Sequence, residues 1–289
     1  MQPLLVILGP TAVGKTRLAV RLALRLGGEI VSADSAMVYR YMDVGTDKPP
    51  PEVLAAVPHH LVSVRDPDQP FSVSEFQRLA REAIADIAAR GRLPLLVGGT
   101  GLYIRAVIRP GYDFPPAPPD PQLRAALAAR AAQEGAGALY LELRRVDPEA
   151  AERIGPHNAR RLVRALEVYL RTGVPFSRWL ARATGGRSGP ALYDALLVGL
   201  TREREDLYRR IEERVEDQLR RGLVEEVRGL LARGYDPALP ALQALGYKEV
   251  IAYLQGRVPY EEMVRVLKRN TRRYAKRQGT WFRREEGVR

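Results

Sequence analysis

Residues 9–16 read Gly9-Pro10-Thr11-Ala12-Val13-Gly14-Lys15-Thr16, and they lie between an apolar run at 4–8 and a segment with helical spacing at 18–26. A strand, a glycine-rich turn and a helix in this order form the context that a phosphate-binding loop requires. In such a loop the backbone N–H groups converge on phosphate, and the helix N-terminus adds a partial positive charge. We expect Lys15 to reach the phosphates and the Thr16 hydroxyl to hold Mg²⁺. The alternative is a glycine turn that matches by chance, and the complete pattern disfavours it.

The composition of the 289 residues is that of a globular protein, with 46% hydrophobic and 28% charged residues. The absence of cysteine excludes disulfides, thiolate catalysis and cysteine-ligated zinc, and it suits a reducing cytosol, so we expect a cytoplasmic protein. No apolar run reaches membrane-spanning length, and the opening run is too short for a signal peptide. The net charge of +12 favours a polyanionic partner, with an arginine-rich solvated surface as the alternative.

Short apolar runs alternate with helical segments, which is typical of a parallel, doubly wound α/β sheet. The segment 72–75 has the spacing of a capping box and opens a helix that is expected to end at Gly91. Further strands are expected at 29–33, 59–64, 94–97 and 195–200.

The proline-rich stretch from 110 to 121 is the clearest break in composition, and the residues that follow it, to about 184, read as wholly helical. We therefore predict an α/β fold in which residues 1–117 and 190–289 form a P-loop parallel-sheet core. Residues 118–189 form an inserted all-helical domain. The C-terminal part of the core is helical again, with one long segment from 204 to about 233.

Ligands of open parallel sheets bind at the carboxyl ends of the strands, and three such ends carry chemistry here. One is the phosphate loop, the second is Asp34, and the third is the sequence Gly-Gly-Thr that ends at Thr100. Asp34 is a candidate general base or indirect Mg²⁺ ligand, and Thr100 a candidate for positioning substrate. Capping of a helix is the alternative for both. The third strand lacks the aspartate with which P-loop ATPases hold Mg²⁺, which argues against a nucleotide-driven motor, while a small-molecule kinase stays open. The three histidines show no metal-ligand spacing.

The basic residues follow a pattern that favours RNA. Arg160, Arg164 and Arg171 share one face of a predicted helix. Residues 265–289 carry ten Lys or Arg against two acids, interleaved with aromatic residues. Cations beside aromatic rings suit phosphate contacts and base stacking. A solvated terminal helix is the alternative.

Five blocks of the sequence resemble those of bacterial tRNA dimethylallyltransferases, in order and over nearly the whole chain. They are GPTAVGKT at 9–16, SADSAMVYRYMDVGTDKP at 32–49, VGGTGLY at 97–103, RALEVY at 164–169 and AKRQGTWFR at 275–283. The resemblance implies a P-loop core with a helical insertion. It also implies transfer of the dimethylallyl group of dimethylallyl diphosphate to N6 of the adenosine 3′ of a tRNA anticodon, in tRNAs that read U-initial codons.

The resemblance also implies roles for individual residues. Asp34 matches the general base, Arg214 an arginine directed at the diphosphate, and Thr100 a residue at the junction of the prenyl and adenosine sites. Mg²⁺ is the implied cofactor, and the partners are the tRNA anticodon stem-loop and dimethylallyl diphosphate, with a monomer expected and no membrane. Residues 9–16 would bind the diphosphate. The residues that match tRNA-contacting positions are Asp34, Ser35, Ala36, Met37, Thr100, Arg124, Arg160, Arg161, Arg164, Gln243, Gly246, Tyr247, Lys248, Lys276, Arg277, Gln278, Trp281 and Arg283.

Other activities remain open at this point. Prenyl transfer to free AMP or ADP would use the same fold, but the basic insertion argues against it. A P-loop kinase for a small alcohol would be indifferent to tRNA. A pure RNA-binding module would leave Lys15 and Asp34 without a purpose.

Overall fold

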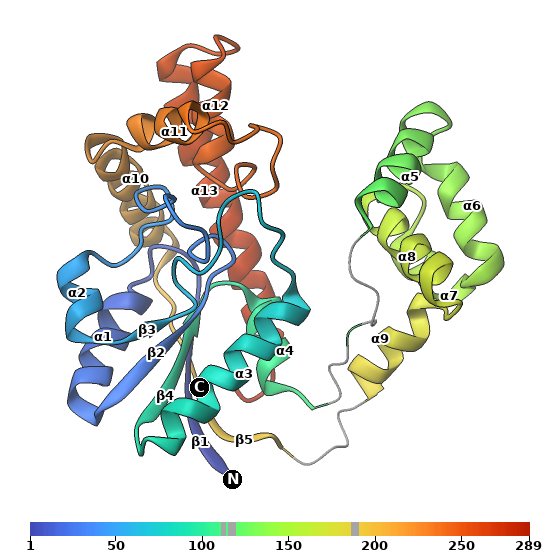
Figure 1. Ribbon diagram of the computed structural model, residues 1–289. Helices are drawn as coiled ribbons and strands as arrows, with labels where there is room; N and C mark the ends of the chain where they lie inside the picture. The colour runs from blue at the N-terminus through green and yellow to red at the C-terminus, as the bar shows by residue number, and fades with distance from the viewer. Residues whose placement is uncertain (111–113, 115–119, 186–190) are drawn as a thin grey trace. The chain divides into compact units, whose positions relative to one another are not determined.

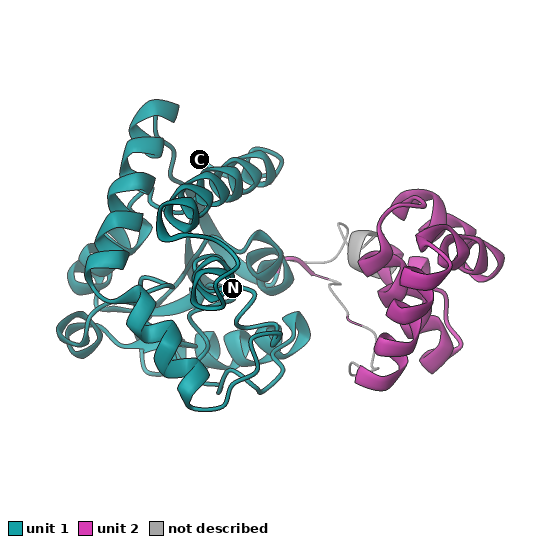
Figure 2. Ribbon diagram, turned by 90° about the horizontal axis from the view of Figure 1, so that it is seen from above, with its two compact units in different colours: residues 1–108, 192–289 teal, residues 109–191 magenta. Residues whose placement is uncertain are grey.

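The structure, a computed structural model, describes residues 1–110, 114, 120–185 and 191–289. It consists of two compact units, each described here by itself: unit 1 comprises residues 1–108 and 192–289, and unit 2 comprises residues 109–191 (Figure 2). The domain boundaries predicted at 117/118 and 189/190 lie outside the described residues.

Unit 1 is built on a five-stranded parallel sheet with the strand order β3-β2-β4-β1-β5 (Figure 1). The strands are β1 (Gln2–Leu8), β2 (Gly28–Ala33), β3 (His59–His60), β4 (Leu93–Gly98) and β5 (Tyr193–Gly199). The predicted strand at 59–64 is therefore too long. Leu61 and Ser63 have left-handed backbone, with φ of 62° and 54°, which ends the extended conformation after His60.

Helices cover both faces of this sheet because β1 is apolar on both sides. Leu4, Val6 and Leu8 pack towards α3 (Val73–Ala89) and α4 (Gly101–Ile108). Leu5 and Ile7 belong to a second cluster with α1 (Lys15–Leu26). The helix α3 begins as predicted, with the Ser72 hydroxyl accepting a hydrogen bond from the N–H of Glu75, and it ends at Ala89. The short helix α2 (Pro51–Ala56) precedes β3.

The C-terminal helices of unit 1 form a separate apolar core. They are α10 (Arg204–Arg220), α11 (Leu223–Ala232), α12 (Tyr247–Leu254) and α13 (Tyr260–Phe282). The long helical segment predicted for 204–233 is thus two helices, because Gly222 adopts φ of 92° and interrupts the helical backbone. Val38 and Met42, which follow β2, pack into this core. The core therefore holds the segment after β2 in place.

The described residues of unit 2 form five helices around one apolar cluster, which agrees with the predicted all-helical insertion. They are α5 (Pro121–Gln133), α6 (Ala136–Val146), α7 (Pro148–Ile154), α8 (Ala159–Thr172) and α9 (Phe176–Gly185). Leu127, Leu139, Leu143 and Leu162 are nearly or fully buried at the centre. Across the described parts of both units, no helix is long and apolar enough to cross a membrane.

Candidate active site

Three strand ends meet at one edge of the sheet, as the sequence predicted for the carboxyl ends of parallel strands. β4 pairs with both β1 and β2, so the phosphate loop, Asp34 and Thr100 follow adjacent strands. The strands approach so closely that a Cβ on Gly98 would lie 2.2 Å from the carbonyl oxygen of Ala33. Only glycine fits there, and the close approach brings the three segments together.

The phosphate loop turns tightly between β1 and α1. Ala12 and Gly14 have left-handed backbone, with φ of 63° and 108°. The Lys15 ammonium donates to the carbonyl oxygen of Pro10 at 2.8 Å, so it is folded back across the loop. Burial lowers the pKa of Lys15 to about 8, although Asp34 opposes this shift and Arg214 adds to it. The loop therefore holds a cation that an incoming anion would stabilise.

Arginines from α10 and the turn before it hold the other side of this loop. The Arg214 guanidinium donates to the Thr11 hydroxyl at 3.0 Å. Arg210 donates to the carbonyl oxygen of Ala12 at 3.0 Å, and Arg202 to that of Val13 at 3.1 Å. Arg214, which the resemblance directs at the diphosphate, thus lies beside the phosphate loop.

Asp34 both caps a turn and faces the site. Its Oδ1 accepts hydrogen bonds from the N–H groups of Ala36 at 2.9 Å and Met37 at 3.3 Å. Its side chain also lines the cavity described below. The two alternatives for Asp34, a cap and a functional carboxylate, are therefore compatible. The hydrogen bonds to Oδ1 fix the orientation of the carboxylate, and Oδ2 is left for a ligand.

Thr100 joins two segments of the site. Its hydroxyl accepts a hydrogen bond from the N–H of Ser35 at 3.3 Å, and it lies close enough to the Tyr274 phenol to influence its pKa. Burial and the charge of Asp34 raise the pKa of Tyr274 to about 12, so this phenol stays neutral. Tyr274 was not among the predicted site residues. Its spacing of four from Gln278, which places both on one helix face, could have revealed it.

These residues surround a cavity of about 690 Å³, counting the space that is open to solvent. Its polar lining comes from Thr11, Lys15, Thr16, Asp34, Asp47 and Arg214. Its apolar lining comes from Ala19, Ile30, Met37, Val62 and Val97. His59 also lies on the wall, where Nδ1 donates to the carbonyl oxygen of Val57 at 2.7 Å and burial lowers its pKa. One cavity therefore offers cations and a carboxylate next to apolar side chains.

The cavity could hold Mg²⁺ if phosphate oxygens of a bound substrate supplied the remaining ligands of the ion. Among the described residues, no group of three or more His, Asp or Glu could hold a metal ion. Thr16 and Asp34 line the cavity, and Mg²⁺ commonly takes few protein ligands beside phosphate oxygens and water. The residues present fit that arrangement.

One face of α13 packs against the sheet edge at which the phosphate loop and the segment after β4 meet. Gln278 is only 7% exposed, and its Oε1 accepts from the N–H of Thr11 at 2.8 Å while its Nε2 donates to the carbonyl of Gly99 at 2.9 Å. Trp281 packs so tightly on Gly101 that a Cβ there would lie 2.3 Å from the ring, and Arg105 stacks on the ring at 4.4 Å. Both residues were predicted to contact tRNA. Their contacts give both residues a structural role, while Trp281 stays partly exposed and Gln278 lines the cavity, so the tRNA contacts stay predictions.

Gly246 and Tyr247 are a second correction. Tyr247 is fully buried, and its hydroxyl donates to Glu226 at 2.7 Å. The N–H of Gly246 donates to Glu249 at 2.9 Å. These two residues, which were predicted to contact RNA, are buried and hydrogen-bonded within the C-terminal core. Their neighbours Gln243 and Lys248 are exposed.

In unit 2, a buried acid engages two of the predicted RNA-binding arginines. Glu167 is fully buried and accepts from Arg124 at 2.9 Å, from Arg164 at 2.7 Å and from the N–H of Asp120 at 2.8 Å. Arg124 and the N–H of Asp120 link α5 to α8, whereas the Arg164 pair lies within α8. Both arginines therefore have a structural partner. Arg160 and Arg161 are exposed, and no described acid forms an ion pair with them.

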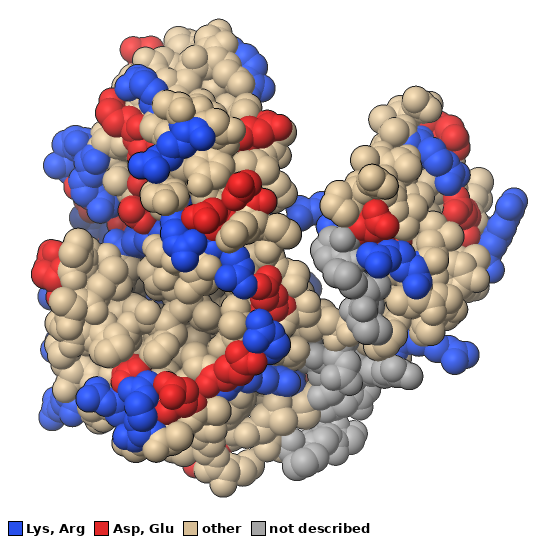
Figure 3. All heavy atoms as spheres, viewed as in Figure 1, with Lys and Arg blue, Asp and Glu red and all other residues tan. Residues whose placement is uncertain are grey.

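The exposed cations that match the predicted RNA contacts in unit 1 are Lys276, Arg277 and Arg283 on or directly after α13, together with Lys248. On the face drawn in Figure 3, basic side chains are interspersed with acidic ones over unit 1. The described residues on that face of unit 1 therefore offer RNA separate small groups of cations and no continuous basic surface.

Known proteins of one kind resemble this chain over nearly its full length. A family described as IPP transferase matches residues 37–285, and one described as isopentenyl transferase matches residues 2–65. A tRNA dimethylallyltransferase of Geobacillus thermodenitrificans is 54% identical over 287 residues, which cover 99% of this chain and 89% of the relative. One from Symbiobacterium thermophilum is 54% identical over 283 residues, covering 98% of this chain and 87% of the relative.

Solved structures agree as well. The tRNA isopentenylpyrophosphate transferase of Bacillus halodurans has a TM-score of 0.71 at 45% identity, covering 100% of this chain and 89% of that one. A eukaryotic dimethylallyltransferase acting on tRNA has a TM-score of 0.81 at 28% identity, covering 98% of this chain and 70% of that one. The phosphate loop, the strand-end aspartate and these matches over nearly the full length lead to one conclusion: the chain belongs to the tRNA dimethylallyltransferase family.

Proposed function

We propose that the chain transfers the dimethylallyl group of dimethylallyl diphosphate to N6 of the adenosine 3′-adjacent to the anticodon, in tRNAs that read U-initial codons. The observation that carries this proposal is the cavity, which joins a cationic phosphate loop to apolar walls and a fixed carboxylate. A prenyl diphosphate has the same division into a charged and an apolar part. The names of the curated relatives support the same reaction.

In the proposed step, a bond forms between N6 of the adenosine and C1 of the dimethylallyl group, and the bond between C1 and the diphosphate oxygen breaks. Asp34 takes the proton that N6 loses, and inorganic diphosphate leaves. An exocyclic amine is a poor nucleophile, so a base within hydrogen-bond reach lowers the barrier. The N–H groups of Ala36 and Met37 hold the Asp34 carboxylate in one orientation for this transfer.

The charge that develops on the leaving diphosphate is met by cations of the chain. Lys15 and Arg214 flank the phosphate loop, and cations fixed in advance stabilise such charge without reorganisation. Mg²⁺, when bound beside Thr16, would supply further neutralisation of the diphosphate. Thr100 and Tyr274 lie at the same edge and suit the entry of the base.

The acceptor base has to leave the stack of the anticodon loop to reach the cavity. The exposed cations of unit 1 and the exposed Arg160 and Arg161 of unit 2 suit phosphate contacts with the tRNA. We infer that the enzyme acts as a monomer, because the residues that line the cavity all come from unit 1.

The test is incubation of the purified chain with Mg²⁺, radiolabelled dimethylallyl diphosphate and unmodified tRNA, followed by digestion of the RNA. Labelled N6-dimethylallyladenosine is expected. A parallel reaction with AMP in place of tRNA, and one with ATP as donor, serve as controls. Label on AMP alone, or phosphate transfer from ATP, would refute the proposal.

A further inference from the structure

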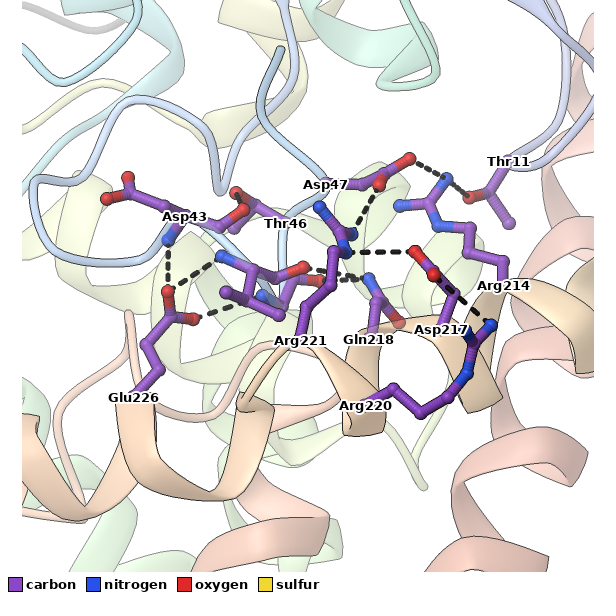
Figure 4. A network of polar contacts seen from close by, with 12 residues as sticks. Thr11, Asp43, Thr46, Asp47, Arg214, Asp217, Gln218, Arg220, Arg221 and Glu226 are labelled. Carbon is purple, nitrogen blue, oxygen red and sulfur yellow. Dashed lines mark hydrogen bonds and ion pairs between the residues drawn. The ribbon is translucent and has the colours of Figure 1, made fainter. Parts of the chain in front are cut away.

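The segment that follows Asp34 carries a second carboxylate, Asp47, into the cavity, and the C-terminal core holds this segment rigidly (Figure 4). The Glu226 carboxylate of α11 accepts three successive backbone N–H groups, from Asp43 at 2.7 Å, Val44 at 2.7 Å and Gly45 at 3.0 Å. Such a set of charge-assisted bonds fixes the path of the loop.

Further contacts restrain the same loop. The Gln218 amide of α10 donates to the carbonyl oxygens of Val44 at 3.1 Å and Gly45 at 3.0 Å. The Tyr247 ring packs so closely on Gly45 that a Cβ there would lie 2.6 Å from it. The ammonium of Lys48, which is 8% exposed, donates to Asp43 at 2.6 Å and to the Ser63 hydroxyl at 2.9 Å. The position of Asp47 is therefore set by its neighbours.

The carboxylate of Asp47 contacts two arginines, Arg214 of α10 and Arg221 directly after that helix. Its Oδ2 lies 3.4 Å from Arg214, and its Oδ1 accepts from Arg221 at 2.9 Å. The nitrogen of Arg214 that faces Asp47 also donates to the Thr11 hydroxyl of the phosphate loop. Figure 4 shows Arg214 extended between Thr11 and Asp47.

We propose that Asp47 is a positioning residue that holds Arg214 at the phosphate loop in the free enzyme and competes with diphosphate for this arginine. The inference rests on the proposed function of the phosphate loop. A carboxylate and a diphosphate bind the same guanidinium donors, and their like charges repel. Because the loop is fixed, Asp47 stays beside the bound anion. It weakens the hold on inorganic diphosphate and so favours release of this product.

The experiment measures the dissociation constant of inorganic diphosphate for the free protein by titration calorimetry, at fixed Mg²⁺ and low ionic strength. Asp47→Asn is the informative variant, because Asp47 has φ of 58° and asparagine tolerates this backbone. We expect diphosphate to bind about three- to tenfold more tightly, from the loss of one nearby negative charge. The gain should shrink at high salt. Damage to the fold would weaken binding, so tighter binding identifies the proposed role.

Glu213→Gln is the matched control, because Glu213 is an exposed acid of the same helix that pairs with Arg209 and has no ion pair with Arg214 or Arg221 among the described residues. Its diphosphate affinity should stay within about twofold of the wild type. Asp47→Gly, which also accepts a positive φ, repeats the test if the asparagine variant is unstable.

Unchanged or weaker diphosphate binding in both Asp47 variants would overturn the inference. If the wild type binds no inorganic diphosphate, both the inference and the role of the phosphate loop fail. If the wild type binds it and transfers the prenyl group to tRNA, only the inference fails when the variants show no gain.

Discussion

Replacement of Gln278 by methionine should destabilise unit 1, because one amide bridges two backbone groups that lie far apart in the sequence. Methionine keeps the length of the side chain but neither accepts from the N–H of Thr11 nor donates to the carbonyl of Gly99. Each buried backbone group left without a partner costs about 1–3 kcal/mol. We therefore expect the free energy of unfolding of unit 1 to fall by about 2–4 kcal/mol, and the affinity for dimethylallyl diphosphate to fall with it.

The assay is urea unfolding followed by tryptophan fluorescence. The chain has two tryptophans, of which Trp281 lies in unit 1 and Trp179 in unit 2. In a Trp179→Phe background the signal reports on unit 1, which matters because two units need not unfold in one transition. Gln255→Met is the control. Gln255 is exposed, and Arg257 is its one side-chain partner among the described residues, so its loss should change the unfolding free energy by less than about 0.5 kcal/mol.

The variant Gln278→Glu tests the same bridge through the direction in which its stability changes with pH. A protonated carboxyl could donate to Gly99 and accept from Thr11 as the amide does, so the folded state should raise the pKa of the introduced group. The stability of this variant, relative to the wild type, should then be greatest at low pH and be lost as pH rises through the raised pKa. An unfolding free energy of Gln278→Met within about 0.5 kcal/mol of the wild-type value would refute the bridging role.

Three further predictions follow from the site and from unit 2. Asp34→Asn should lower kcat about 10²- to 10⁴-fold with little change in tRNA affinity; an equal loss of affinity would assign Asp34 to recognition. Because burial lowers the pKa of Lys15 to about 8, Lys15 loses its charge as pH rises through that value, so diphosphate affinity should decline above pH 8. Lys15→Arg should abolish this decline; its persistence would point to another group. In unit 2, Glu167→Gln should lower the unfolding free energy by about 2 kcal/mol, because a neutral amide weakens the charge-assisted bonds to Arg124 and Arg164. The matched control Glu149→Gln breaks only an exposed pair and should cost under about 1 kcal/mol in the same urea titration.

Local sequence patterns were sufficient for the architecture of unit 1. Apolar runs before glycine-rich turns predicted β1 and β4, and the capping residue Ser72 predicted the start of α3. These signals are local, because a strand, a cap or a phosphate loop depends on residues only a few positions apart. The same reasoning failed at Gly222 and at Leu61, where single residues with left-handed backbone end an element. Composition does not reveal such a conformation.

The sequence by itself determined the phosphate loop, the strand-end aspartate and, through its motif blocks, the family. Only the tertiary structure decided which basic and polar residues remain free for RNA. Gln278 and Tyr247 read as surface contacts in the sequence, yet they bond to groups more than a hundred and about twenty residues away, respectively. Likewise, Arg124 is paired because Glu167 approaches it from another helix. Burial and pairing of this kind depend on how distant segments pack, and the spacing of residues along the chain carries no record of it.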